Sequence, residues 1–109
     1  MNQSKVYSRR NEILSKFKNL TGSYSNTIKI NPHNSAQHEL KKFSIALELI
    51  KAGVEVFTEI ELKKGGVCDI LGIDRNGDAL IFEIINTESK ESIENKREIY
   101  PFTIIEVKA

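Results

Sequence analysis

The chain has 109 residues, of which 39% are hydrophobic and 28% charged, a balance typical of a single globular domain with one modest core. Its formal net charge of +1 gives no global signal for nucleic acid, and its one cysteine, Cys68, excludes an intramolecular disulfide and a multi-cysteine zinc site. Because the sequence has neither a long apolar run nor a secretory signal, we expect a cytoplasmic, intracellular protein without membrane contact.

The first 33 residues predict a helix and a polar loop that extend a core domain over residues 34–109. Ser8 can cap a helix over Arg9–Leu20, in which four apolar residues recur at helical spacing: Ile13, Leu14, Phe17 and Leu20. The other face of this helix is basic and carries Arg9, Arg10, Lys16 and Lys18. Such a face is either simply solvated or a patch that contacts phosphate groups.

A second helix is predicted to end near Ala52. Asn34 and Gln37 fit a capping box at its start, and Gly53 suits the left-handed position just beyond its end. Its predicted buried stripe consists of Leu40, Phe43, Ala46, Leu47 and Ile50. Glu39 lies at the edge of that stripe, which places its carboxylate at the mouth of the core.

The rest of the chain predicts strands and one further helix. Val54–Leu62 alternates, with one face formed by Val54, Val56, Thr58, Ile60 and Leu62. Val67–Asp74 and Ala79–Ile85 are apolar on both faces and therefore central. A charged helix over Glu88–Glu98 leads to a last strand, Thr103–Lys108, which the crossover rule makes parallel to the third. The predicted fold class is α/β, a four-stranded mixed sheet flanked by helices with an extra N-terminal helix.

Two carboxylates, Asp69 and Glu83, interrupt the apolar central strands, although a buried carboxylate is costly unless it is paired or bound to metal. The turn between the strands decides whether they meet. A two-residue loop at Asn76-Gly77 would put Asp69 opposite Ile84, whereas a three-residue loop with Gly77 in the left-handed conformation would put Asp69 opposite Glu83. We favour the three-residue loop, because one divalent cation between the two acids then accounts for both.

This order of elements and acids resembles the PD-(D/E)xK nuclease superfamily over residues 34–108. Glu39 matches the helix acid of the family, Cys68-Asp69 its Pro-Asp step and Glu83-Ile84-Ile85 its Glu-x-Lys step. The run GGVCDILGIDRNGDALIFEIINTESKESIENKREIYPFTIIEV is similar to nuclease-like domains of the CoiA type. The archaeal resolvases and restriction endonucleases share the core more distantly. The resemblance implies a restriction-endonuclease-like α-β-β-β-α-β core and metal-dependent hydrolysis of phosphodiester bonds in DNA.

The resemblance also implies a metal site. Mg²⁺ or Mn²⁺ would be held by Asp69, Glu83, Glu39 and the backbone carbonyl of Ile84, and would activate a water molecule. Ile85 stands where the family has its catalytic lysine, so an apolar side chain replaces an ammonium group.

Lys42, three residues after Glu39, is the candidate for a relocated lysine, and Lys41 or Lys64 could also reach the site. Each of the three is otherwise an ordinary surface lysine. His38 is interpreted as a surface histidine of the first helical turn, with proton carrier or metal ligand as the alternative.

The expected partner is DNA, with phosphate contacts from Arg9, Arg10, Lys41, Lys63 and Lys64. A domain of this size covers little duplex, so we expect a homodimer if both strands are cut. The alternative is a nuclease-fold protein that has lost catalysis and works as a nucleic-acid-binding or protein-interaction module, which Ile85 favours. A third possibility is a domain unrelated to nucleic acid.

Overall fold

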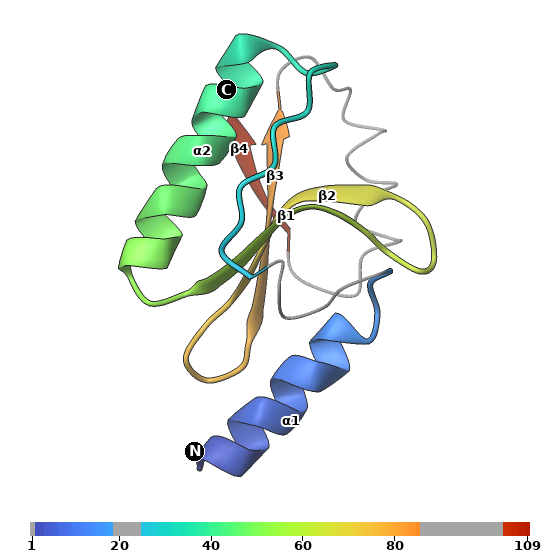
Figure 1. Ribbon diagram of the computed structural model, residues 1–109, viewed down its shortest axis with the longest axis vertical. Helices are drawn as coiled ribbons and strands as arrows, with labels where there is room; N and C mark the ends of the chain where they lie inside the picture. The colour runs from blue at the N-terminus through green and yellow to red at the C-terminus, as the bar shows by residue number, and fades with distance from the viewer. Residues whose placement is uncertain (1, 19–24, 86–103) are drawn as a thin grey trace.

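The computed structural model describes residues 2–18, 25–85 and 104–109 of the chain. The helices are α1 (Gln3–Leu14) and α2 (Ala36–Lys51), and the strands are β1 (Glu55–Glu61), β2 (Val67–Ile73), β3 (Ala79–Ile85) and β4 (Ile104–Lys108) (Figure 1). The predicted helix over Glu88–Glu98 lies outside the described residues. Neither described helix is long and apolar enough to cross a membrane.

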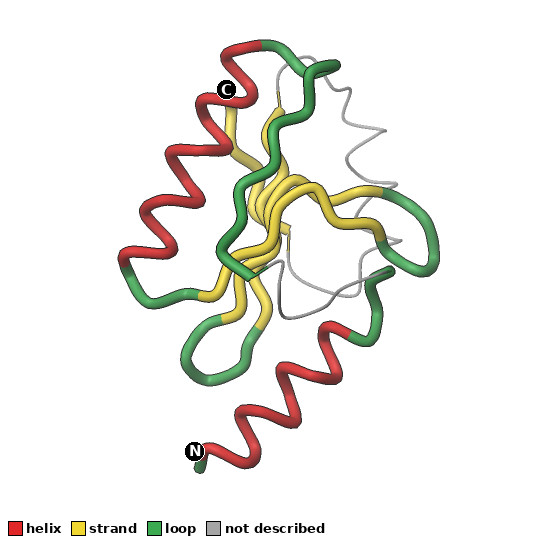
Figure 2. The backbone as a smooth tube through the Cα atoms, in the orientation of Figure 1, coloured by secondary structure: helices red, strands yellow, loops and turns green. Residues whose placement is uncertain are grey.

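The four strands form one sheet in the order β1-β2-β3-β4. β2 is antiparallel to both β1 and β3, and β4 is parallel to β3. Figure 2 shows α2 running along the sheet, while α1 lies beyond the end that carries the β2–β3 turn. The α/β class with a four-stranded mixed sheet is therefore confirmed, including the parallel last strand.

The sheet separates two hydrophobic clusters. The cluster on the α2 side contains Val56, Ile70 and Ile84 from the strands together with Ala46 from α2. The cluster on the opposite side gathers Phe57, Leu71 and Ile81 from the strands with two residues of the N-terminal segment, Ile13 and Phe17. The N-terminal segment thus packs into the same cluster as one face of the sheet.

The first helix lies earlier in the chain than predicted. Asn2 rather than Ser8 caps it, because the Asn2 side chain accepts a hydrogen bond from the backbone N–H of Lys5. The helix ends at Leu14, since Phe17 has left the helical conformation to form an antiparallel bridge with Leu62. The prediction of a helix over Arg9–Leu20 is therefore wrong at both ends.

The second helix is rotated relative to its predicted orientation. Leu40, Phe43 and Leu47 were expected to be buried, yet their exposed fractions are 69%, 47% and 36%. Glu39 and Lys42 are buried instead, alongside His38 and the correctly predicted Ala46. An apolar stripe normally faces the core, but here the charged residues face the sheet because they find partners there, as described below.

The ends of α2 follow the predicted chemistry with one shift. Ser35 rather than Asn34 is the N-cap, and its hydroxyl accepts from the backbone N–H of His38 at 3.1 Å. Gly53, with φ +85°, occupies the left-handed position after the helix as predicted. Asn34 is thereby left to donate its amide to Glu39.

The regular alternation predicted for Val54–Leu62 breaks at Glu59. Glu59 has φ +49°, a left-handed conformation that a non-glycine residue seldom adopts inside a strand. As a result Phe57 and Ile60 point into the same cluster, although they would face opposite sides of a regular strand. Phe57, which the predicted alternation puts on the opposite face from Val56, is fully buried.

The β2–β3 hairpin has the favoured three-residue loop. Its register pairs Ile73 with Ala79 and Ile70 with Phe82. Gly77 has φ +81°, and the backbone N–H of Asp74 donates to the carbonyl of Asp78 at 3.0 Å. If the register is continued by one residue beyond Ile70 and Phe82, Asp69 faces Glu83.

Candidate active site

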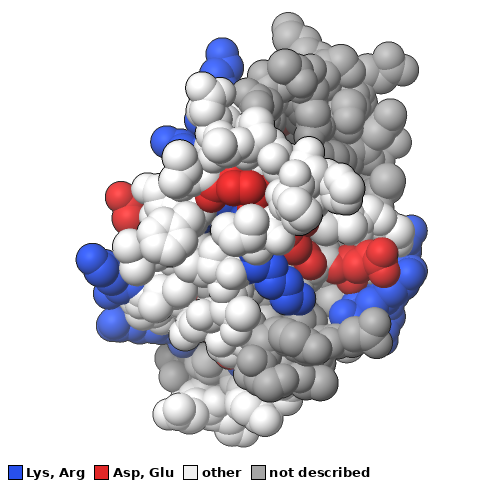
Figure 3. Space-filling view, turned by 45° about the horizontal axis from the view of Figure 1, so that its top comes forward, with Lys and Arg blue, Asp and Glu red and all other residues white. Residues whose placement is uncertain are grey.

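Charged side chains gather where the first turns of α2 approach the kinked part of the sheet. The residues are His38, Glu39, Lys42, Glu59 and Asp69. On the face shown in Figure 3, acidic side chains reach the surface close to basic ones. These residues come from one helix and two strands, so only the tertiary fold brings them together.

Glu39 is the hub of this cluster. One carboxylate oxygen, Oε2, accepts from the Lys42 ammonium at 2.6 Å and from the backbone N–H of Asn31 at 3.0 Å. The other, Oε1, accepts from the amide of Asn34 at 2.9 Å and lies 3.0 Å from Nδ1 of His38. Burial by itself raises the pKa of Glu39, but these hydrogen bonds outweigh it and lower the pKa to about 2. Glu39 is therefore ionised, with both of its oxygens occupied by protein donors.

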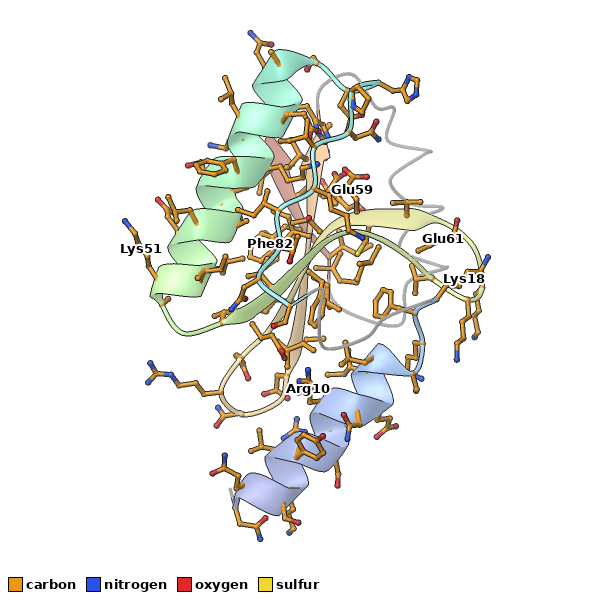
Figure 4. All side chains as sticks on the ribbon, in the orientation of Figure 1. Arg10, Lys18, Lys51, Glu59, Glu61 and Phe82 are labelled. Atoms are coloured by element: carbon orange, nitrogen blue, oxygen red, sulfur yellow. The ribbon has the colours of Figure 1, made fainter. Side chains whose placement is uncertain are left out.

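Lys42 joins the helix to β1. Its side chain is fully buried, and its ammonium lies 2.9 Å from Oε1 of Glu59 as well as 2.6 Å from Glu39. Figure 4 shows Glu59 near the middle of β1, where the left-handed residue kinks the strand. Because a buried ammonium without partners would be very unfavourable, these two carboxylates explain how α2 can turn a lysine inwards.

Asp69 is held by the backbone of the neighbouring strand. Its Oδ2 accepts from the N–H of Ile84 at 2.9 Å and lies 3.4 Å from Nε2 of His38. His38 thus has a carboxylate oxygen beside each ring nitrogen, those of Glu39 and Asp69, and an imidazolium would donate to both. The interpretation of His38 as a surface residue is wrong, since only 9% of it is exposed.

Glu83 is buried, with 4% of its surface exposed. It alternates with Ile84 along β3, so it lies on the face that also carries Ile81, whereas Ile84 faces α2. The pKa of the Cys68 thiol reflects the charges around it. Burial, with the charges of Glu83, Asp69 and Glu59 adding to it, raises the pKa of Cys68 well above its usual value. Cys68 is a neutral core residue, and three carboxylates lie within electrostatic range of it.

The two predicted phosphate-binding arginines are used inside the protein. Arg9 pairs with Asp78 of the β2–β3 turn, and Arg10 binds Glu55 through two hydrogen bonds of 2.6 and 2.9 Å. The hydrogen bond to Glu55 is the main reason that the pKa of Arg10 is raised, and the same bond lowers the pKa of Glu55. Both arginines therefore fasten α1 to the sheet, and Arg10 is labelled in Figure 4.

The predicted lysines lie in different environments. Lys42 enters the charged cluster, Lys41 is half-buried on α2, and Lys63 and Lys64 are exposed in the β1–β2 turn. Glu59 was not predicted as a residue of the site, because the alternating pattern of Val54–Leu62 gives no sign of a left-handed residue.

The carboxylate oxygens of Asp69 and Glu83 and the backbone carbonyl oxygen of Ile84 are ligands of the kind that hard cations prefer. Within the described residues, no three or more His, Cys, Asp or Glu side chains are arranged around a common metal position. Magnesium commonly takes only one or two protein carboxylates and keeps its water ligands, so Asp69, Glu83 and the Ile84 carbonyl remain a suitable set.

No family model, curated protein or solved structure matches this chain.

Proposed function

We propose that this chain is a metal-dependent, nuclease-like protein that hydrolyses phosphodiester bonds in DNA. The observation that carries the proposal is the register of the β2–β3 hairpin, which would have Asp69 facing Glu83 if it were continued by one residue beyond Ile70 and Phe82. Like charges directly opposite each other on adjacent strands are destabilising, and a divalent cation shared by the two carboxylates would offset that repulsion. The order helix, three antiparallel strands and a parallel last strand supports a restriction-endonuclease-like core as part of this proposal.

Asp69, Glu83 and the backbone carbonyl of Ile84 would hold the metal. The carbonyl of Ile85 accepts from Ala109, next to β4, so the carbonyl of Ile84 points the other way, towards β2 and Asp69. When bound, the metal supplies Lewis acidity that activates a water molecule and offsets charge on the scissile phosphate.

The role of Glu39 in this proposal differs from the metal ligand expected from the sequence. With both oxygens occupied, it acts in this proposal by orienting Lys42 and His38.

Two lysines can supply the positive charge that Ile85 does not. Lys42 is buried against Glu39 and Glu59. Lys108 is the parallel-strand partner of Ile85, so its side chain lies on the same face of the sheet, one strand away. Lys108 is exposed, whereas the ammonium of Lys42 is already engaged by two carboxylates. Lys108 is therefore the better placed of the two to meet a phosphate.

The test is cleavage of end-labelled DNA with Mg²⁺ or Mn²⁺, comparing the wild type with Asp69→Asn. The asparagine keeps the size of the side chain and an oxygen for the N–H of Ile84, but it removes the negative charge. We expect cleavage to fall at least 100-fold, with Lys51→Gln, an exposed lysine of α2, as the unaffected control. An inactive wild type on duplex, single-stranded and branched DNA would contradict the proposal.

The second candidate is a nuclease-fold module without catalysis, and Ile85 is the observation that favours it. Under this hypothesis the wild type is inert, and Ile85→Lys restores the charge that the motif lacks. Activity that appears only in Ile85→Lys would select this candidate, and an active wild type would eliminate it.

A further inference from the structure

We propose that one end of the sheet is a binding surface for the phosphate backbone of nucleic acid, built from Lys16, Lys18, Lys63 and Lys64. We call these four residues the basic edge. The inference rests on the proposed function for its choice of nucleic acid as the ligand. It differs from the expected DNA contacts, because Arg9 and Arg10 are engaged inside the protein and Lys41 is not part of it. Of the basic face predicted for the first helix, only Lys16 and Lys18 belong to it.

The basic edge exists because two distant segments pair. The antiparallel bridge between Phe17 and Leu62 is flanked by two backbone hydrogen bonds, from the N–H of Lys63 to the carbonyl of Lys16 at 2.9 Å and from the N–H of Lys18 to the carbonyl of Glu61 at 2.8 Å. Phe17 and Leu62 are buried, with 2% and 1% exposed. Their neighbours therefore point to the opposite, exposed side of the pair.

This pairing puts Lys16 directly opposite Lys63. Like charges at opposed positions of an antiparallel pair are destabilising. Within the described residues, Lys18 forms an ion pair with Glu61 at 3.1 Å, while Lys16, Lys63 and Lys64 take part in no ion pair. Four lysines against one glutamate leave a local charge of +3, although the whole chain carries only +1. Binding of an anionic partner would offset the repulsion between Lys16 and Lys63.

The position of the basic edge favours a polymer of phosphates over a single ion. Beyond the kink at Glu59, Ile60 and Leu62 point into the cluster with Ile13, so Glu61 and Lys63 face the side of the sheet that α2 covers. Lys63 follows Glu59 by four residues, a distance of roughly 13 Å along an extended chain. A nucleic acid strand lying on the basic edge would thus continue towards Asp69. In Figure 3, basic side chains gather at the right-hand edge, around an acidic patch.

The test measures binding without cleavage. A fluorescent 20-base-pair duplex and the matching single strand are titrated with protein in EDTA at several salt concentrations, and anisotropy gives the dissociation constant. We expect Lys16→Gln/Lys63→Gln to bind less tightly than the wild type and to reduce the slope of log affinity against log salt by about 2. The matched control, Lys5→Gln/Lys51→Gln, removes the same charge from two exposed lysines of α1 and α2 and should leave binding within twofold of wild type.

A second variant separates binding from folding. Lys63→Glu places an acid opposite Lys16, so we expect its melting temperature to equal or exceed that of the wild type while binding weakens. Equal losses in the basic-edge and control pairs would overturn the inference. So would a wild type without salt-sensitive binding, or basic-edge variants that lose binding only to vesicles containing phosphatidylserine.

The outcome is independent of the nuclease test. If basic-edge variants lose binding and the wild type does not cleave, the inference stands and the nuclease proposal fails. If the wild type cleaves and the variants bind normally, the nuclease proposal stands and the inference fails.

Discussion

Lys42 shows how single residues decide the orientation of an element in this protein. A lysine is almost never fully buried unless it is paired, and Lys42 meets two carboxylates, Glu39 and Glu59. Those pairs let α2 turn a charged side towards the sheet and leave Leu40, Phe43 and Leu47 exposed. The left-handed backbone of Glu59 also contributes, because it reverses the side of the sheet to which the side chains after Glu59 in β1 point.

Replacing Lys42 tests the strength of this cluster. In Lys42→Met the side chain keeps its volume, but Glu39 and Glu59 lose the cation between them, so we expect unfolding to become easier by about 3–5 kcal/mol. Urea denaturation followed by circular dichroism measures the change. The double variant Lys42→Met/Glu59→Gln removes one of the two uncompensated charges and should recover part of the loss. A loss below about 1 kcal/mol in the single variant would show that the ion pairs are not what holds α2.

The β2–β3 hairpin is the element on which the meeting of the two strand acids depends, because its register continued by one residue would set Asp69 opposite Glu83. Its three-residue loop needs a left-handed residue at Gly77, and the turn also lies against α1. A Cβ at Gly77 would come within 2.9 Å of the carbonyl oxygen of Val6. Both the register of the sheet and the docking of α1 therefore depend on one glycine.

Gly77→Ala is expected to destabilise the protein by more than about 1 kcal/mol, because the alanine adds backbone strain and a contact with α1. Gly65→Ala is the matched control. Gly65 has φ +106°, but a Cβ there meets no atom within 4 Å, so this variant carries the strain alone. Chemical denaturation of both variants isolates the contact with α1. Equal losses of stability in the two variants would mean that the contact with α1 does not contribute.

For the whole molecule, the charged cluster couples folding to pH. Glu39 has a pKa of about 2 in the folded protein against an ordinary value of 4.5. A carboxyl whose pKa is lowered on folding stabilises the folded state above its unfolded pKa, and this contribution disappears as the pH falls towards the folded pKa. Glu55, whose pKa is also lowered by folding, acts in the same direction.

We therefore expect the free energy of unfolding to fall as the pH drops from about 4.5 to about 2. Denaturant titrations at several pH values measure this slope. Glu39→Gln cannot titrate, so its stability should vary less with pH over that range, whatever its absolute stability. A slope as steep as that of the wild type would mean that Glu39 is not the group responsible.

The sequence by itself determined the α/β class, the three consecutive strands and the end of α2 at Gly53, and it favoured the three-residue loop with a left-handed Gly77 without excluding the two-residue one. These features follow from local rules, since hydrophobic periodicity and the conformational freedom of glycine act over a few residues. The same rules named Asp69 and Glu83 as the buried acids whose meeting depends on the register.

Only the tertiary structure decided which side of α2 faces the sheet, where β1 kinks and how the N-terminal segment pairs with Leu62. The pattern of Leu40, Phe43 and Leu47 pointed to the wrong face, because the partners of Lys42 and His38 come from residues far away in sequence. The ion pairs of Arg9 and Arg10 and the meeting of Lys16 with Lys63 are long-range for the same reason. Pairing between distant charges and backbones is a property of the assembled fold, and no local pattern encodes it.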